Sequence, residues 1–202
     1  MTSKEAADML RTRFDSAISG ATDFRGETGL CVEAKSLAAV AAYCRDELGF
    51  DYLVDISSID HFGDEPRFEV VYELSVLESG THLRLKVALS EDEPVVQSVT
   101  DLWPTADWHE REVFDMMGIR FEGHPDLRRI LMWDGYPYHP LRKDFPLEGK
   151  PSDMPDVAFT ESAPLAGGPF VTAPTPGDTQ VREPRARRPG DLPPSETFIP
   201  EP

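Results

Sequence analysis

Cysteine is scarce in this chain, which has only Cys31 and Cys44 among its 202 residues. The two lie on separate expected elements and lack the close spacing of a CxxC pair. Because an iron–sulfur cluster usually takes four thiolates, we expect no such cluster here. Two reduced, half-buried cysteines that pack like small apolar residues are the simplest interpretation.

Long apolar runs are also missing. No stretch approaches the ~20 residues that a membrane-spanning helix needs. The opening MTSKEAADML lacks the apolar core of a signal peptide, and Glu5, Asp8 and Asp15 argue against an acid-poor transit segment. We therefore expect a soluble or peripheral protein with a bacterial cytoplasmic address.

Positive charge is in short supply, because 20 Lys and Arg residues stand against 37 Asp and Glu residues, a net charge of −17. Such a balance disfavours binding to polyanions, so nucleic acid is not an expected partner. Residues 104–150 depart from this pattern, with 7 basic and 9 acidic side chains. A nearly balanced segment suits a surface that pairs charges.

Glycine-rich phosphate loops are absent as well. Without a GxxxxGKS or GxGxxG segment, nucleotide binding is weakly supported, although Arg128–Arg129 and Arg142–Lys143 could hold a phosphate. We interpret these basic pairs as ion-pair partners, within the chain or across an interface, of Asp126, Asp134 and Asp144.

Residues 1–107 have the pattern of an α+β domain. A capping box at Thr2–Glu5 opens a helix that we expect to continue to Gly20. A strand at residues 30–34 precedes a second helix, capped by Ser36 and closed by Gly49. Residues 51–59 have the pattern of a further strand.

Residues 68–76 and 82–89 alternate between apolar and polar side chains, which predicts two strands with one apolar face each. If Ser79–Gly80 form a two-residue turn, Val76 faces Leu83, Leu74 faces Leu85, Tyr72 faces Val87 and Glu73 meets Lys86. The order of elements predicts an α+β fold whose mostly antiparallel sheet has helices packed on one side.

Asp107 is expected to cap a helix over residues 108–117, which Gly118 would stop. Glu110 lies on the apolar face of this helix, where a carboxylate can act as a general acid or base. Its position three residues after the cap favours a structural bond back to the helix start. The opposite face, in water or against another protein, carries Trp108, Arg111, Glu112 and Asp115, and Arg111 can pair with Asp115 there.

The histidines do not complete a metal motif. His109–Glu110 begins an HExxH zinc motif, but Val113 stands where the second histidine is needed. His124 and His139 are each followed by proline, which is typical of turn and cap positions, and metal ligation by the two is the less favoured alternative. We expect no metal site and no catalytic residue in this chain.

The run from Trp108 to Gly149 carries the most information in the sequence. It contains Glu110-Arg111-Glu112, Asp115-Met116-Met117, His124, Arg128-Arg129-Ile130-Leu131, and then His139-Pro140-Leu141-Arg142-Lys143-Asp144-Phe145-Pro146-Leu147. In this order the residues closely resemble the signature of the 30-kilodalton subunit family of respiratory complex I. The match extends over roughly a fifth of the chain.

The resemblance implies a non-redox subunit in the hydrophilic arm of a proton-translocating NADH:quinone oxidoreductase, beside the quinone-site subunit. FMN, iron–sulfur clusters and quinone are then expected in neighbouring subunits, and this chain is expected to hold no cofactor. The implied location is peripheral, on the cytoplasmic side of the bacterial inner membrane. Two alternatives stay open: the equivalent subunit of a membrane-bound hydrogenase-type complex, and an independent metal-assisted hydrolase that uses His109, Glu112, His124 and His139.

The composition changes after Lys150, because 12 of the 19 prolines fall in the last 52 residues. Such a segment cannot bury a core of its own. We expect residues 151–202 to be a long extended tail bound to a partner, and residues 108–150 to share one globular unit with residues 1–107. The residues expected to dock partner subunits are Arg111, Glu112, Asp115, His124, Arg128, Arg129, His139, Arg142, Lys143, Asp144, Phe159, Phe170 and Phe198.

Overall fold

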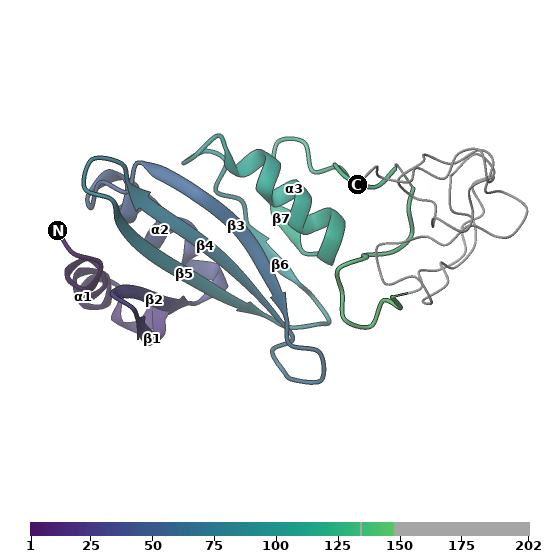
Figure 1. Cartoon of the computed structure of the whole chain (residues 1–202), viewed down its shortest axis with the longest axis horizontal. Helices are drawn as coiled ribbons and strands as arrows, with labels where there is room; N and C mark the ends of the chain where they lie inside the picture. The colour runs from purple at the N-terminus through teal and green to yellow at the C-terminus, as the bar shows by residue number, and fades with distance from the viewer. Residues whose placement is uncertain (134, 148–202) are drawn as a thin grey trace, which may run out of the picture. The chain divides into compact units, whose positions relative to one another are not determined.

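A computed structural model of the chain describes residues 1–133 and 135–147, and Met1–Asp144 form one compact unit. Its elements, labelled in Figure 1, are α1 (Ser3–Arg13), η1 (Asp15–Ala17), β1 (Ile18–Phe24), β2 (Glu27–Val32), η2 (Ala34–Ser36), α2 (Leu37–Asp46), β3 (Tyr52–Asp60), β4 (Phe68–Val76), β5 (Thr81–Leu89), β6 (Val95–Gln97), α3 (Ala106–Met117) and β7 (Arg120–Glu122). Within those described ranges, no helix has the length and apolar character needed to cross a membrane.

Five strands form the main sheet in the order β1-β2-β5-β4-β3. All neighbours are antiparallel except β2 and β5, which run parallel. Helices α1 and α2 lie on one face of this sheet (Figure 1) and bury an apolar core that includes Leu10, Val40 and Leu85. The predicted α+β fold with a mostly antiparallel sheet is confirmed for the described residues.

Helix α3 lies along β3, the last strand of the sheet, and the short parallel pair β6–β7 lies next to it (Figure 1). Its last turn ends at Gly118, whose φ of 75° is left-handed, as predicted for the helix stop. The N-cap is Thr105 and makes no side-chain cap bond, so the prediction of Asp107 as the cap was wrong.

The hairpin of β4 and β5 forms, but the predicted register was wrong by two residues. Leu74 pairs with Leu83, Tyr72 with Leu85, and Glu73 with Arg84. The turn is longer than two residues because the ladder ends at Val76 and Thr81, where Gly80 has a φ of 64°. A shift of two leaves every side chain on its predicted face, so the apolar pattern alone could not distinguish the two registers.

The N-terminal segment departs more from the prediction. The capping box is present, with Glu5 N–H donating to Thr2 Oγ1 at 3.2 Å and Thr2 N–H to Glu5 Oε2 at 2.8 Å. The helix ends at Arg13, however, and Gly20 lies inside strand β1 instead of stopping a helix. β1 is an edge strand whose side chains are mostly exposed, so it has no apolar alternation to reveal it.

Two smaller boundaries also differ. β2 covers residues 27–32 instead of 30–34, and Ser36 makes no capping bond because the short helix η2 precedes α2. Gly49, with a φ of 77°, follows α2 as predicted.

Candidate functional site

Asp115 on α3 organises the segment that follows the helix. Its Oδ2 accepts the backbone N–H groups of Ile130, Leu131 and Met132 at 3.0, 2.8 and 2.8 Å. Its Oδ1 pairs with the guanidinium of Arg129, which also donates to the Asp115 carbonyl at 3.1 Å. One fully buried carboxylate thus holds the turn of residues 129–132 against α3.

These bonds decide the protonation of Asp115. Burial on its own raises the pKa of this carboxyl, but the bonds from Met132, Arg129, Leu131 and Ile130 together lower the pKa below its ordinary value. Asp115 is therefore held as a carboxylate. The predicted partner, Arg111, is not bonded to it.

Arg111 has a different role from the predicted one. Its guanidinium donates to the carbonyls of Arg128 and Arg129 at 3.3 Å each and lies 5.4 Å from the ring centre of Trp108. Arg111 and Asp115 are both buried, so the prediction that this face lies in water or against another protein was wrong for these two residues. Arg111 and Asp115 use their polar groups to fix the loop 128–132.

The segment 139–142 closes the C-terminal end of α3. His139 Nδ1 lies 3.0 Å from the Asp115 carbonyl, Leu141 N–H donates to the Met116 carbonyl at 3.2 Å, and Arg142 Nε donates to the Met117 carbonyl at 2.7 Å. The last carbonyls of a helix have no partner inside it, and this segment supplies one for each of the three. Burial lowers the pKa of His139, which favours the neutral ring in this position.

A second charge network ties the signature to the sheet. Arg67, whose side chain is 2% exposed, forms two bonds to Asp60 at 2.9 and 3.0 Å and also pairs with Glu91 and Asp144. Asp60 additionally accepts the Lys143 N–H at 2.8 Å. The bonds from Arg67 lower the pKa of both Asp60 and Asp144.

Arg67, Asp60 and Glu91 were not predicted from the sequence. No local pattern marks them, because they lie on different elements and Arg67 and Asp144 are 77 positions apart. Arg67 lies between Pro66 and Phe68, immediately before strand β4, and nothing in that short stretch indicates its partners.

Glu110 is structural, but not through the predicted bond to the helix start. Its Oε1 accepts the Val99 N–H at 2.7 Å, while Oε2 is buried and has no hydrogen bond to any residue that the structure describes. The Tyr72 hydroxyl is likewise buried and has no hydrogen-bond partner among the described residues, and His124 Nε2 is 4.0 Å from Glu110 Oε2. Burial is the main reason that the pKa of Glu110 rises to about 7.

The histidines are held by separate partners in this chain. His109 Nδ1 lies 3.1 Å from Asp55, His124 Nε2 lies 3.2 Å from Asp107, and His139 contacts the Asp115 carbonyl. Over residues 1–133 and 135–147, no group of three or more His, Cys, Asp or Glu side chains could hold a metal ion.

Other predicted docking residues remain at the surface. Arg128 forms an exposed pair with Asp126, and the side chains of Glu112 and Lys143 are exposed. Large apolar side chains are exposed beside them, with Trp108 at 61% and Leu131 at 63%. Phe159, Phe170, Phe198 and Asp134 lie outside the described residues. The outward surface of the signature therefore combines apolar and charged groups, which is typical of protein interfaces.

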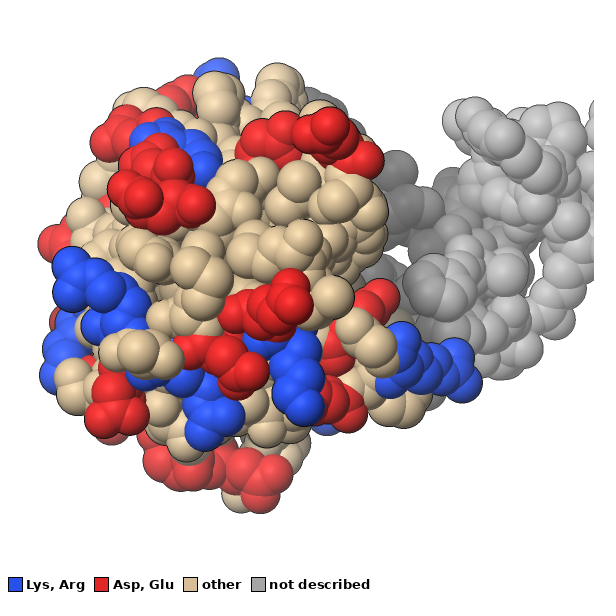
Figure 2. Space-filling model, turned by 90° about the vertical axis from the view of Figure 1, so that its left-hand side faces the viewer, with Lys and Arg blue, Asp and Glu red and all other residues tan. Residues whose placement is uncertain are grey.

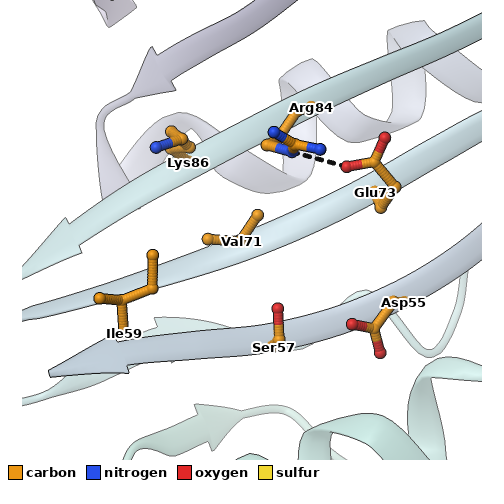
Figure 3. Close-up of a pocket in the computed structure, with 7 residues that line it drawn as sticks. All are labelled: Asp55, Ser57, Ile59, Val71, Glu73, Arg84 and Lys86. Carbon is orange, nitrogen blue, oxygen red and sulfur yellow. Dashed lines mark hydrogen bonds and ion pairs between the residues drawn. The ribbon is translucent and has the colours of Figure 1, made fainter. Parts of the chain in front are cut away.

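The polar face of the sheet is open beside this region. Figure 3 shows Asp55, Ser57 and Ile59 of β3, Val71 and Glu73 of β4, and Arg84 and Lys86 of β5 around a depression of about 340 Å³. Arg84 donates to Glu73 at 2.7 Å, and Lys86 pairs with Glu69 at 2.9 Å.

Figure 2 shows another face, seen from the side of α1, on which basic and acidic side chains are also interspersed. Such mixing favours local pairing over a field of one sign.

Comparison with known proteins matches residues 30–151 to the family "Respiratory-chain NADH dehydrogenase, 30 Kd subunit". The NADH-quinone oxidoreductase C subunit of Geotalea uraniireducens is 42% identical over 140 residues, which cover 69% of this chain and 85% of the relative. The same subunit of a Roseiflexus species is 45% identical over 155 residues, 76% of this chain and 86% of the relative.

Solved structures agree on the fold. The trypsin-resistant fragment 1–134 of Nqo5 matches with a TM-score of 0.55 and 31% identity, over 61% of this chain and 98% of the fragment. A chain of an archaeal membrane-bound sulfane sulfur reductase matches with a TM-score of 0.61 and 24% identity, over 71% of this chain and 85% of that chain. The second likeness concerns the fold alone.

Proposed function

We propose that this chain, which belongs to the family of the 30-kilodalton subunit of respiratory-chain NADH dehydrogenase, is a non-redox scaffold subunit of the hydrophilic arm of NADH:quinone oxidoreductase. It supports the quinone-site subunit while electrons pass from NADH to quinone through neighbouring subunits. The resemblance predicted from the signature residues is confirmed by the family match; the scaffold role is the proposal.

The observation that carries this role is the use of the signature charges. Asp115, Arg111, Arg129 and Arg142 bond to backbone groups and to one another and so fix the loops that follow α3. Side chains with fixed partners inside the chain serve to hold its surface in shape. On the outer surface of this region, Trp108, Glu112 and Leu131 are exposed.

In this proposal the chain holds no redox group of its own. FMN, iron–sulfur clusters and quinone belong to its neighbours, and proton translocation belongs to the whole complex. The chain lies on the cytoplasmic side of the bacterial inner membrane and is attached to it through its partners.

Co-purification tests the proposal directly. An affinity-tagged chain, expressed in its native host and extracted from membranes with mild detergent, should bring down cluster-bearing subunits and NADH:quinone oxidoreductase activity. The same chain purified alone should carry no stoichiometric iron or flavin absorbance. Recovery of a stable, partner-free chain from membranes and cytoplasm would overturn the proposal.

The two alternatives have less support. The likeness to the sulfane sulfur reductase complex, at 24% identity, concerns the fold and does not favour a hydrogenase-type complex over the proposed one. An independent hydrolase would use His109, Glu112, His124 and His139 together, whereas each of the three histidines is held by a different partner.

A further inference from the structure

A groove lies between strand β3 and helix α3. It has a volume of about 170 Å³ and is lined by Asp55 to Ser58 on one side and by α3 and Leu141 on the other. A cavity of about 150 Å³ is enough to hold a benzene molecule. The groove therefore has room for one long side chain and is too small for a helix or a cofactor.

The groove has an apolar floor and an acidic mouth. Ile56, Val113, Met116 and Met117 line it and are buried. Asp55 and Glu112 stand at its exposed edge, and His109, 3.1 Å from Asp55, is charged only when protonated. Within residues 1–133 and 135–147, no lysine or arginine pairs with either carboxylate.

We propose that this groove receives the side chain of one lysine or arginine from another subunit of the complex. The inference rests on the proposed function, because it requires that such a subunit exists. A lysine or arginine has a long apolar stem that packs on apolar surface while its charged head stays at the edge. The methionines and Val113 take the stem, and Asp55 and Glu112 pair with the head.

Two further observations favour an occupant from another subunit. The groove adjoins the depression on the open sheet face, since Asp55 and Ser57 line both, so a partner seated there reaches it without a break. Exposed Trp108 lies on the same helix as Glu112, and Leu141 at 58% exposure borders the groove. Aromatic side chains are enriched at the centre of protein interfaces.

Filling or reversing the groove tests the proposal in the tagged, membrane-extracted complex. Ser57→Trp places a large side chain at the border that the groove shares with the depression on the sheet face, and Glu112→Lys puts a positive charge at the mouth of the groove. Each variant should recover at least about tenfold less of the partner subunits than the unaltered chain, because a central anchor is lost.

Matched controls separate this effect from misfolding. Ser79→Trp, in the β4–β5 turn, and Glu122→Lys, at an exposed position of β7, make the same changes away from the groove and should recover partners normally. All four variants should keep the thermal midpoint of the unaltered chain. Normal recovery with Ser57→Trp and Glu112→Lys would overturn the proposal.

Labelling identifies the occupant. A Glu112→Cys variant should react rapidly with a maleimide in the purified full-length chain and slowly in the complex. Protection already present in the purified chain would mean that the chain fills its own groove, which would overturn the proposal. If the unaltered chain recovers no partner subunits at all, the proposed function fails. If the unaltered chain and the groove variants recover them equally, this inference alone fails.

Discussion

Two carboxylates on the same helix reach opposite protonation preferences because their bonding differs. Asp115 accepts three backbone N–H groups and a guanidinium, which outweigh its burial. Glu110 accepts one backbone N–H, its Oε2 has no hydrogen bond within residues 1–133 and 135–147, and its pKa rises to about 7. Burial penalises both charges, and only sufficient hydrogen bonding removes the penalty.

Glu110 makes stability depend on pH. Its pKa is higher in the folded chain than the ordinary 4.5, so the folded state binds the proton more tightly and stability falls as pH rises from about 4.5 to about 7. Glu110→Gln removes this titration. Its free energy of unfolding relative to the unaltered chain should rise by roughly 2 kcal/mol between pH 5 and pH 8.

Denaturant unfolding at the two pH values measures this difference. Glu112→Gln changes an exposed carboxylate on the same helix and should leave the difference constant. A constant difference for Glu110→Gln as well would show that Glu110 does not carry the pH dependence.

Asp115→Asn should destabilise the chain by about 3 kcal/mol at pH 7, because the amide places N–H groups against donors that need an acceptor. The lowered pKa of Asp115 gives stability that is present above its ordinary pKa and lost as pH falls, so the deficit should shrink in acid. Asp126→Asn, in the exposed pair with Arg128, should change stability by less than about 0.5 kcal/mol. Equal effects of the two substitutions in thermal unfolding would contradict this account.

At the scale of elements, the end of α3 is set by contacts that its own sequence does not contain. His139 and Arg142 pack against Gly118 so closely that a Cβ there would lie 2.6 Å from His139 Nε2 and from Arg142 Nη2. The glycine thus provides both a left-handed backbone and the space for the closing segment.

Gly118→Ala should therefore lower the free energy of unfolding by about 3 kcal/mol or more. This loss is larger than that for an ordinary alanine with left-handed backbone, because overpacking adds to the backbone strain. Gly123→Ala is the matched control, since its φ of 82° is similar and a Cβ there meets nothing within 4 Å. It should cost about 1 kcal/mol. If both variants show the same fall in the free energy of unfolding, the close contact with segment 139–142 does not matter.

The sequence predicted the features that depend on local pattern and missed those that depend on distant contacts. Helix α1 with its capping box, the paired strands β4 and β5, and the stop at Gly118 follow from local pattern and were predicted. The register of the hairpin, edge strand β1 and the bonds of Asp115 and Arg67 depend on residues distant in the chain or on patterns that two arrangements share. The family signature indicated where the important residues lie but not which of them face inward.

For the whole molecule, the difference between residues that hold the fold and residues that face outward determines which substitutions test assembly. Asp115, Arg129, Arg142 and Arg67 hold the fold, so replacing them changes stability and assembly together. Surface groups with few bonds inside the chain can report on partners alone. Trp108 is the largest such group on the signature helix, at 61% exposure.

Trp108→Ala should leave the free energy of unfolding within about 1 kcal/mol of the unaltered chain, because the Trp108 ring is mostly exposed and its cation–π contact with Arg111 contributes about that much at most. The amount of assembled complex in membranes should fall at least about tenfold, since a large aromatic anchor is lost. NADH:quinone oxidoreductase turnover per assembled complex should stay unchanged.

Phe24→Ala is the control for Trp108→Ala. Phe24 is 67% exposed on β1 and lies 5.1 Å from the Arg25 guanidinium, and its loss should alter neither the free energy of unfolding nor the amount of assembled complex. Normal assembly with Trp108→Ala would remove this face of α3 from the interface, and reduced turnover at normal assembly would place Trp108 in the reaction instead of the scaffold.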